Sequence, residues 1–129
     1  MGREWSKGGF ALRIPTEHEE QKNVVTWFDL QYPAIKGRLF AVPNGSNKSM
    51  ATAAKFKAEG LRSGVPDLML PVARGGFHGL FIEMKRVKNS RLSPEQDDWL
   101  TFLAKEGYMV VVCKGFEPAK QTIDAYLAY

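Results

Sequence analysis

The sequence predicts an α/β protein in which helices flank one mixed sheet. Segments with helical periodicity alternate with short apolar runs, in the order helix, strand, helix, strand, strand, helix, strand, helix. The two middle strands are separated by the glycine turn Arg74-Gly75-Gly76, which indicates a hairpin. The first of them, Asp67-Leu68-Met69-Leu70, is apolar at successive positions, as a strand buried on both faces is.

Length and composition indicate one globular domain. The chain has 129 residues, of which 44% are hydrophobic and 25% are charged. Residues 1–14 show no clear periodicity and are interrupted by Gly8-Gly9. We therefore expect an N-terminal arm over residues 1–14 and a single domain over residues 15–129. No apolar run approaches the ~20 residues that span a bilayer, and no signal-peptide pattern is present. We therefore expect a cytoplasmic protein without a membrane partner.

The net charge and the cysteine content indicate the kind of partner and the redox compartment of the protein. The net charge of +4 favours a polyanionic partner such as nucleic acid, without establishing one. The single cysteine, Cys113, excludes an intramolecular disulfide and fits a reducing compartment. The sequence contains no Walker loop, dinucleotide fingerprint or zinc-type cluster, so we expect no small-molecule cofactor.

The first helix is expected from Glu17 to about Gln31, after the N-cap Thr16. An ionised carboxylate on the apolar face of this helix requires a partner, because burying an unpaired charge is costly. For Glu20, both a salt bridge to a basic residue and a bound metal remain open. The face is expected to hold Glu20, Val24, Trp27, Phe28 and Gln31.

A short strand, Arg38–Val42, and a helix, roughly Lys48–Glu59, are expected next. Asn44 begins a strong turn pair, and it either serves the turn alone or hydrogen-bonds a phosphate or the site loop. The helix has a basic edge, which is either a solvated face or a contact for a phosphate backbone. That edge consists of Lys48, Lys55 and Lys57 and continues to Arg62.

The hairpin brings charged residues together. Asp67 stands at the head of one strand, and the next strand, Leu80–Lys85, ends in Glu83-Met84-Lys85. Because side chains alternate along a strand, Glu83 and Lys85 point to one side of the sheet and Met84 points to the other. The hairpin can hold Asp67 beside Glu83 and Lys85. Two carboxylates next to one ammonium form a candidate site for a divalent metal.

The chain after the hairpin supplies a loop and a helix. The loop Arg86–Arg91 is basic and follows the strand directly, which makes it a candidate contact for the DNA backbone. Ser93 then begins a helix in which Gln96 has capping-box spacing. Gln96 also shares a face with Trp99 and Leu100, which aims it inward. The capping role and a role in the site both remain open.

A buried strand, Tyr108–Cys113, and a final helix, Phe116–Tyr129, complete the expected chain. Gly107 ends the preceding helix as a C′ glycine. The final helix carries Ile123 and Tyr126 on one side, which would cover the sheet or meet a second subunit.

Pro66-Asp67 followed by Glu83-Met84-Lys85 resembles the PD-(D/E)xK nuclease signature. Four further segments occur in the order expected of the VRR-NUC branch of that superfamily, the virus-type replication-repair nucleases. The resemblance covers roughly residues 16–119. The four segments are His18-Glu19-Glu20-Gln21, Pro43-Asn44-Gly45, Gly64-Val65-Pro66-Asp67 and Ser93-Pro94-Glu95-Gln96.

The resemblance implies a restriction-endonuclease-like core and metal-assisted hydrolysis of phosphodiester bonds. It favours Glu20, Asp67 and Glu83 as ligands of Mg²⁺ or Mn²⁺. The backbone carbonyl of Met84 is a further candidate ligand. Lys85 would orient or activate a water molecule, or stabilise charge in the transition state. Gln96 would help to align that water or Lys85.

The chain is similar to small stand-alone phage and bacterial members of the branch, which suggests a homodimer that resolves four-way (Holliday) junctions in DNA recombination or repair. A less selective nuclease of flap or duplex DNA, and a non-catalytic nucleic-acid-binding module on the same fold, remain alternatives. The candidate DNA contacts are Asn44, Lys48, Lys55, Arg62, Arg86, Lys88 and Arg91.

Overall fold

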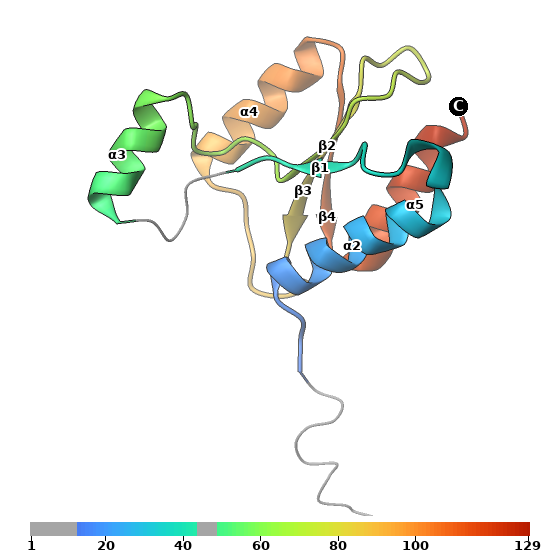
Figure 1. Cartoon of the computed structure of the whole chain (residues 1–129), viewed down its shortest axis with the longest axis horizontal. Coiled ribbons are helices and arrows are strands. Elements are labelled where there is room, and N and C mark those ends of the chain that lie inside the picture. The colour runs from blue at the N-terminus through green and yellow to red at the C-terminus, as the bar shows by residue number, and fades with distance from the viewer. Residues whose placement is uncertain (1–12, 44–48) are drawn as a thin grey trace, which may run out of the picture.

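The structure, a computed structural model, describes residues 13–43 and 49–129 (Figure 1). The predicted order of helices and strands is confirmed, with one added 3-10 turn. Most of the predicted arm, and also Asn44 and Lys48, lie outside the described residues. The elements are α2 (Glu17–Gln31), η1 (Pro33–Ile35), β1 (Phe40–Ala41), α3 (Met50–Ala58), β2 (Leu68–Leu70), β3 (Leu80–Lys85), α4 (Pro94–Lys105), β4 (Met109–Lys114) and α5 (Phe116–Leu127).

The four strands form the predicted mixed sheet in the order β1-β2-β3-β4. β1 and β2 pair antiparallel, β2 and β3 pair antiparallel, and β3 and β4 pair parallel. Leu68 is paired with Ile82, so the antiparallel register brings Asp67, one residue earlier, next to Glu83, one residue later. The hairpin therefore aligns the two carboxylates that are 16 positions apart in the sequence.

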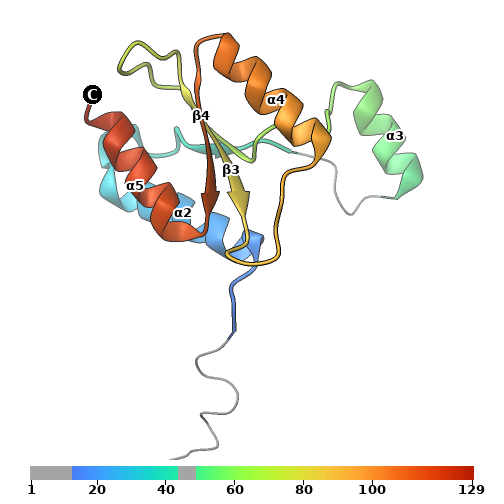
Figure 2. The same ribbon diagram turned by 180° about the vertical axis from the view of Figure 1, so that it is seen from behind.

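Helices cover both faces of the sheet. α2 and α5 lie side by side on one face, and α4 lies on the other (Figures 1 and 2). The face toward α2 and α5 carries the main apolar core, with Ile82 and Met84 fully buried. The core comprises Val24, Phe28, Leu39, Leu68, Leu70, Leu80, Ile82, Met84, Cys113, Ala119, Ile123 and Tyr126.

Two helices begin at capping boxes that the sequence predicts. Thr16 accepts the N–H of Glu19 at 3.1 Å, and the Glu19 carboxylate accepts the N–H of Thr16 at 2.8 Å. Ser93 and Gln96 make the same reciprocal pair at the start of α4. Each box satisfies backbone N–H groups that a helix N-terminus otherwise leaves unpaired. Both helices therefore begin at the N-cap residue that the sequence predicts.

Three expectations about extent and burial are wrong. The strand predicted at Arg38–Val42 is limited to Phe40–Ala41, because the Arg38 N–H bonds to the carbonyl of Ile35 in a turn instead of joining the ladder. The predicted buried strand is Met109–Lys114, an edge strand on which Val112 and Lys114 are exposed. Gln31 is exposed, because the buried stripe of α2 contains only Glu20, Val24 and Phe28.

α3 stands away from the sheet (Figure 1). None of its residues is buried, although Ser49 caps it in the ordinary way by accepting the N–H of Thr52 at 3.1 Å. The helix is also shorter at both ends than the predicted Lys48–Glu59. Among the residues that the structure describes, no helix is long and apolar enough to cross a membrane.

Candidate active site

Asp67 and Glu83 form the centre of the candidate site. Asp67 immediately precedes β2 and is half-buried, and its Oδ2 accepts the N–H of Met84 at 2.7 Å. Glu83 on β3 is only 2% exposed. The backbone bond to Met84 fixes the Asp67 carboxylate beside Glu83, which agrees with the position that the sequence predicts for the pair.

Burial and mutual repulsion shift the pKa values of this pair. Burial raises the pKa of Glu83 to about 8, with the adjacent charge of Asp67 adding to the shift and Lys85 opposing it. Burial also raises the pKa of Asp67, against the lowering effect of the Met84 N–H. In the absence of a cation, ionisation of both carboxyl groups at once is therefore unfavourable.

Lys85 and Gln96 complete the group. The Lys85 ammonium, 7% exposed, lies 3.6 Å from Oε2 of Glu83 and donates to Oε1 of Gln96 at 2.9 Å. The Gln96 amide nitrogen donates to Oε2 of Glu83 at 3.0 Å. Gln96 also accepts the N–H of Ser93 at 2.9 Å. The two roles left open for Gln96 thus coexist geometrically: it caps α4 and it links the buried lysine to the buried carboxylate.

The donor set of the pair fits a hard divalent cation. Oε1 of Glu83 is buried and has no hydrogen-bond partner among the described residues. A cation bound at the pair would satisfy this oxygen and relieve the repulsion with Asp67. Carboxylate oxygens are ligands that Mg²⁺ and Mn²⁺ prefer. Over residues 13–43 and 49–129, however, no three His, Cys, Asp or Glu side chains come together as a metal cluster.

Glu20, the predicted third ligand, has a structural partner. It is 6% exposed, and its Oε1 accepts the N–H of Phe116 at 3.1 Å. Gly115, at the N-cap position of α5, has no side chain to fill this role, so Glu20 caps α5 from α2. A salt bridge to a basic residue, one of the two alternatives left open for Glu20, is not found within the described part of the chain. Its role as a ligand stays a prediction, as does that of the Met84 carbonyl.

Sequence reasoning missed Glu17. This residue lies in the exposed first turn of α2, and its charge raises the pKa of both Asp67 and Glu83. It is therefore a first-helix carboxylate that acts electrostatically on the pair. The helical periodicity pointed to Glu20, because Glu20 lies on the apolar face of α2. Glu17 lies one turn earlier and off that face, so the periodicity gave no reason to consider it.

Lys114 was also missed. In the parallel register it is the partner of Lys85, and paired residues on neighbouring strands point to the same face. Lys114 is exposed, whereas Lys85 is buried. The sheet face that holds Glu83 thus carries a second ammonium at its edge. The sequence places Lys114 at the end of a strand, but it does not show how β4 is aligned with β3.

The predicted DNA contacts that the structure describes fall into two groups. Lys55 and Arg62 belong to α3 and the segment after it, and both are exposed. The other group lies in the loop from β3 to α4, directly beyond Lys85 (Figure 2). In that loop Lys88 and Arg91 are exposed, and Arg86 is half-buried with its Nε buried and unpartnered among the described residues.

The mixed sheet, the acidic pair at the hairpin and the neighbouring lysine define a nuclease-type α/β fold with a PD-(D/E)xK-like core. The sequence model of the VRR-NUC domain matches residues 13–117, and the chain belongs to the VRR-NUC family.

Two solved structures support the same assignment. One, named "VRR_NUC domain protein", is 37% identical, with a TM-score of 0.79 and coverage of 91% of this chain and 92% of the other. A second, named "VRR_NUC domain", is 25% identical, with a TM-score of 0.54 and coverage of 87% and 99%. No curated protein matches the chain. The expected family and fold are therefore confirmed.

Proposed function

We propose that this protein is a metal-dependent DNA endonuclease that acts as a homodimer on four-way junctions in the cytoplasm. The observation that carries the proposal is the convergence of Asp67, Glu83 and Lys85, with Gln96 hydrogen-bonded to both members of the Glu83–Lys85 pair. A protein that only binds DNA gains nothing from buried carboxylates that face phosphates, so the geometry favours catalysis over binding alone.

Each residue has a defined part in hydrolysis. Asp67 and Glu83 would hold the cation, and a bound Mg²⁺ or Mn²⁺ supplies Lewis-acid polarisation of a phosphoryl oxygen. The Lys85 ammonium has three N–H donors, and Gln96 accepts from one of them. The others can donate to the phosphate oxygens as negative charge builds up. Water attacks phosphorus and gives up a proton to solvent, the P–O ester bond breaks, and the leaving oxygen takes up a proton from solvent.

The proposed dimer matches the symmetry of the proposed substrate. Paired cuts in a four-way junction require two active sites, and a two-fold dimer provides them. The candidate DNA contacts beside the site are cationic, and such contacts position a duplex without reading its sequence. Arg86, Lys88 and Arg91 border Lys85 in the chain, and Lys55 and Arg62 extend the surface toward α3.

The test is cleavage of four labelled DNAs: a four-way junction, a flap, a single strand and a plain duplex. Each is incubated with Mg²⁺, with Mn²⁺ and with EDTA, using the wild type, Asp67→Asn and the matched control Asp98→Asn on the exposed face of α4. We expect paired cuts in the junction that disappear with EDTA and in Asp67→Asn, while Asp98→Asn cuts like the wild type.

The other outcomes are equally informative. Cutting of every DNA would retain the nuclease but replace junction resolution with a less selective flap or duplex activity. Binding without any cutting would support the non-catalytic module. Light scattering that finds only monomer at micromolar concentration would contradict the homodimer.

A further inference from the structure

A cavity of about 640 Å³ lies between the end of β1, α3 and α4. Its lining is largely apolar: it includes Val42, Val65, Phe56 and Trp99, with Glu59 and Arg62 as the charged members. This volume is within the range of roughly 300–1,000 Å³ that is usual for small-ligand sites. The function proposed above uses only Arg62 of this lining, as a candidate contact to the DNA backbone.

The cavity shares its wall with the candidate site. Val65 is two residues before Asp67, and the N–H of Val42 donates to the Asp67 carbonyl at 2.8 Å. Trp99 follows Gln96 by three residues, which is about one turn of α4. A group bound in the cavity is therefore adjacent to the backbone that carries Asp67 and to the helix turn that carries Gln96.

The outer wall of the cavity is α3, and no residue of this helix belongs to the hydrophobic core. None of the α3 residues is buried, yet the segment after the helix is fixed firmly against α4. At Gly64, φ is +91°, and an added Cβ would lie 2.6 Å from the backbone carbon of Glu95. Only glycine permits this approach. The close contact therefore fixes the segment after α3 against the start of α4.

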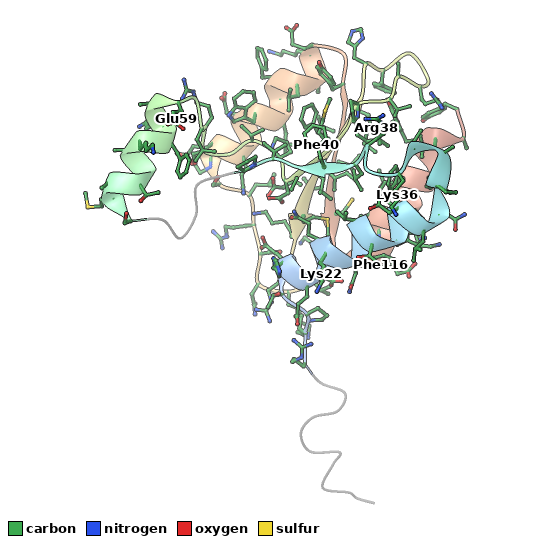
Figure 3. All side chains as sticks on the ribbon, in the orientation of Figure 1. Lys22, Lys36, Arg38, Phe40, Glu59 and Phe116 are labelled. Atoms are coloured by element: carbon green, nitrogen blue, oxygen red, sulfur yellow. The ribbon has the colours of Figure 1, made fainter. Side chains whose placement is uncertain are left out.

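The charged members of the lining are ordered as well. Nη1 of Arg62 donates to the carbonyls of Lys57 at 3.1 Å and Leu61 at 3.2 Å, which holds the guanidinium at the end of α3. Glu59 lies at that same end, where the chain turns back toward the sheet (Figure 3). A guanidinium and a carboxylate together offer donors and an acceptor beside an apolar cavity.

We propose that this cavity binds an unpaired nucleobase of the DNA substrate, stacked against Trp99, while the adjoining phosphate lies at Asp67 and Glu83. A nucleobase is flat and apolar on its faces, and its edge carries donors and acceptors, which matches an aromatic wall with Arg62 and Glu59 beside it. A flap carries unpaired bases, whereas the arms of a four-way junction are fully paired, so there the base must flip out of the pair at the branch point. The inference rests on the proposed nuclease function and adds a specificity site to it.

The binding test uses the full chain with Trp99 as the only tryptophan, obtained by Trp5→Phe and Trp27→Phe. Its fluorescence is followed in EDTA during titration with two single-stranded oligonucleotides that differ only in carrying bases or abasic sites at the central positions. We expect quenching by the base-bearing DNA and much weaker quenching by the abasic DNA, because stacking on an aromatic ring requires a base.

The kinetic test compares Trp99→Leu, Trp99→Phe and the control Tyr129→Leu, an aromatic residue that is 65% exposed, does not line the cavity and packs on Tyr126. Trp99→Leu should slow cleavage of DNA with an unpaired base by about 5- to 150-fold, as expected for the loss of one stack. Trp99→Phe should recover most of the rate, and Tyr129→Leu should leave it unchanged.

The outcomes separate the two proposals. Equal quenching by both DNAs, or equal rates for Trp99→Leu and the wild type, overturns the nucleobase site even if Asp67→Asn abolishes cleavage. Base-dependent quenching in a protein that cuts no DNA supports the site and contradicts the nuclease. Quenching that depends on protein concentration without DNA would assign the cavity to a second copy of the chain and overturn the inference.

Discussion

The two faces of β3 differ in what their buried side chains do. Toward α2 and α5, Ile82 and Met84 are fully buried in an apolar core. Toward α4, Glu83 and Lys85 are nearly as buried, at 2% and 7% exposure, but they are charged and bonded to one another through Gln96. One six-residue strand therefore contributes Ile82 and Met84 to the core on one face and Glu83 and Lys85 to the candidate site on the other.

This division explains how the site can hold charge. The apolar face provides burial free energy, while the opposite face buries a carboxylate pair whose pKa values are raised by burial. The Met84 N–H connects the two, because the residue whose side chain lies in the core donates its backbone hydrogen to Asp67. Changes on the two faces should have separable effects on activity and on stability.

The largest expected effect is on the charged face. Lys85→Met should lower the rate of cleavage by about 100- to 1000-fold, because it removes a donor aimed at the developing charge. Lys114→Met, which removes the exposed lysine paired with Lys85 across the ladder, should lower the rate far less. Single-turnover cleavage at saturating DNA measures both. Equal losses in the two variants would place the reaction nearer the edge of the sheet than β3.

On the core face, Ile82→Ala should lower the free energy of unfolding by about 2–5 kcal/mol, because the side chain is fully buried in the core. The control is Val112→Ala on the opposite face, where the residue is 36% exposed and the loss should be much smaller. Urea unfolding measures both. The cleavage rate of folded Ile82→Ala at low temperature should remain within a few-fold of the wild type, and a large drop would show that the faces are not separable.

The pH dependence of stability tests the electrostatics of the pair. The pKa of Glu83 is raised from 4.5 to about 8 in the folded protein, so folding favours the protonated form. The metal-free protein should therefore lose stability as pH rises from about 4.5 to about 8, with the melting temperature falling on the order of 15 °C. Glu83→Gln should flatten this profile. A cation that binds the pair should raise the melting temperature more at pH 8 than at pH 6.

The smallest expected effect separates two roles of Glu20. If its carboxylate serves only to cap α5, Glu20→Ala should cost about 1 kcal/mol of unfolding free energy. With that capping role alone, Glu20→Gln, which keeps an acceptor oxygen, should melt and cleave like the wild type. Glu17→Gln should slow cleavage more than Glu20→Gln does. Loss of cleavage in Glu20→Gln at an unchanged melting temperature would instead support Glu20 as a metal ligand.

Local patterns predicted much of the fold. The capping boxes at Thr16 and Ser93, the alternation along Leu80–Lys85 and the glycine turn between the middle strands all depend on neighbouring residues, and the structure agrees with each. The sequence also placed Asp67 beside Glu83, because a hairpin fixes its own register.

What the sequence missed depends on contacts between distant segments. The cap that Glu20 provides requires the start of α5 to lie against α2, and no local pattern encodes that approach. The proximity of Lys114 to Lys85 depends on a parallel register set by packing of α4 and α5. The exposure of β4 follows from its place at the edge of the sheet, which an apolar run alone does not reveal.

The hydrogen bond from the Phe116 N–H to Glu20 spans 96 positions in the chain. Contacts of such sequence separation form late, because the loop between them must close first. During synthesis, α2 leaves the ribosome well before its partner α5 exists. The nascent chain therefore carries the sequence of the acidic hairpin before it has the helix that completes the core behind it. We expect cleavage activity to arise only once α5 has emerged and packed against α2.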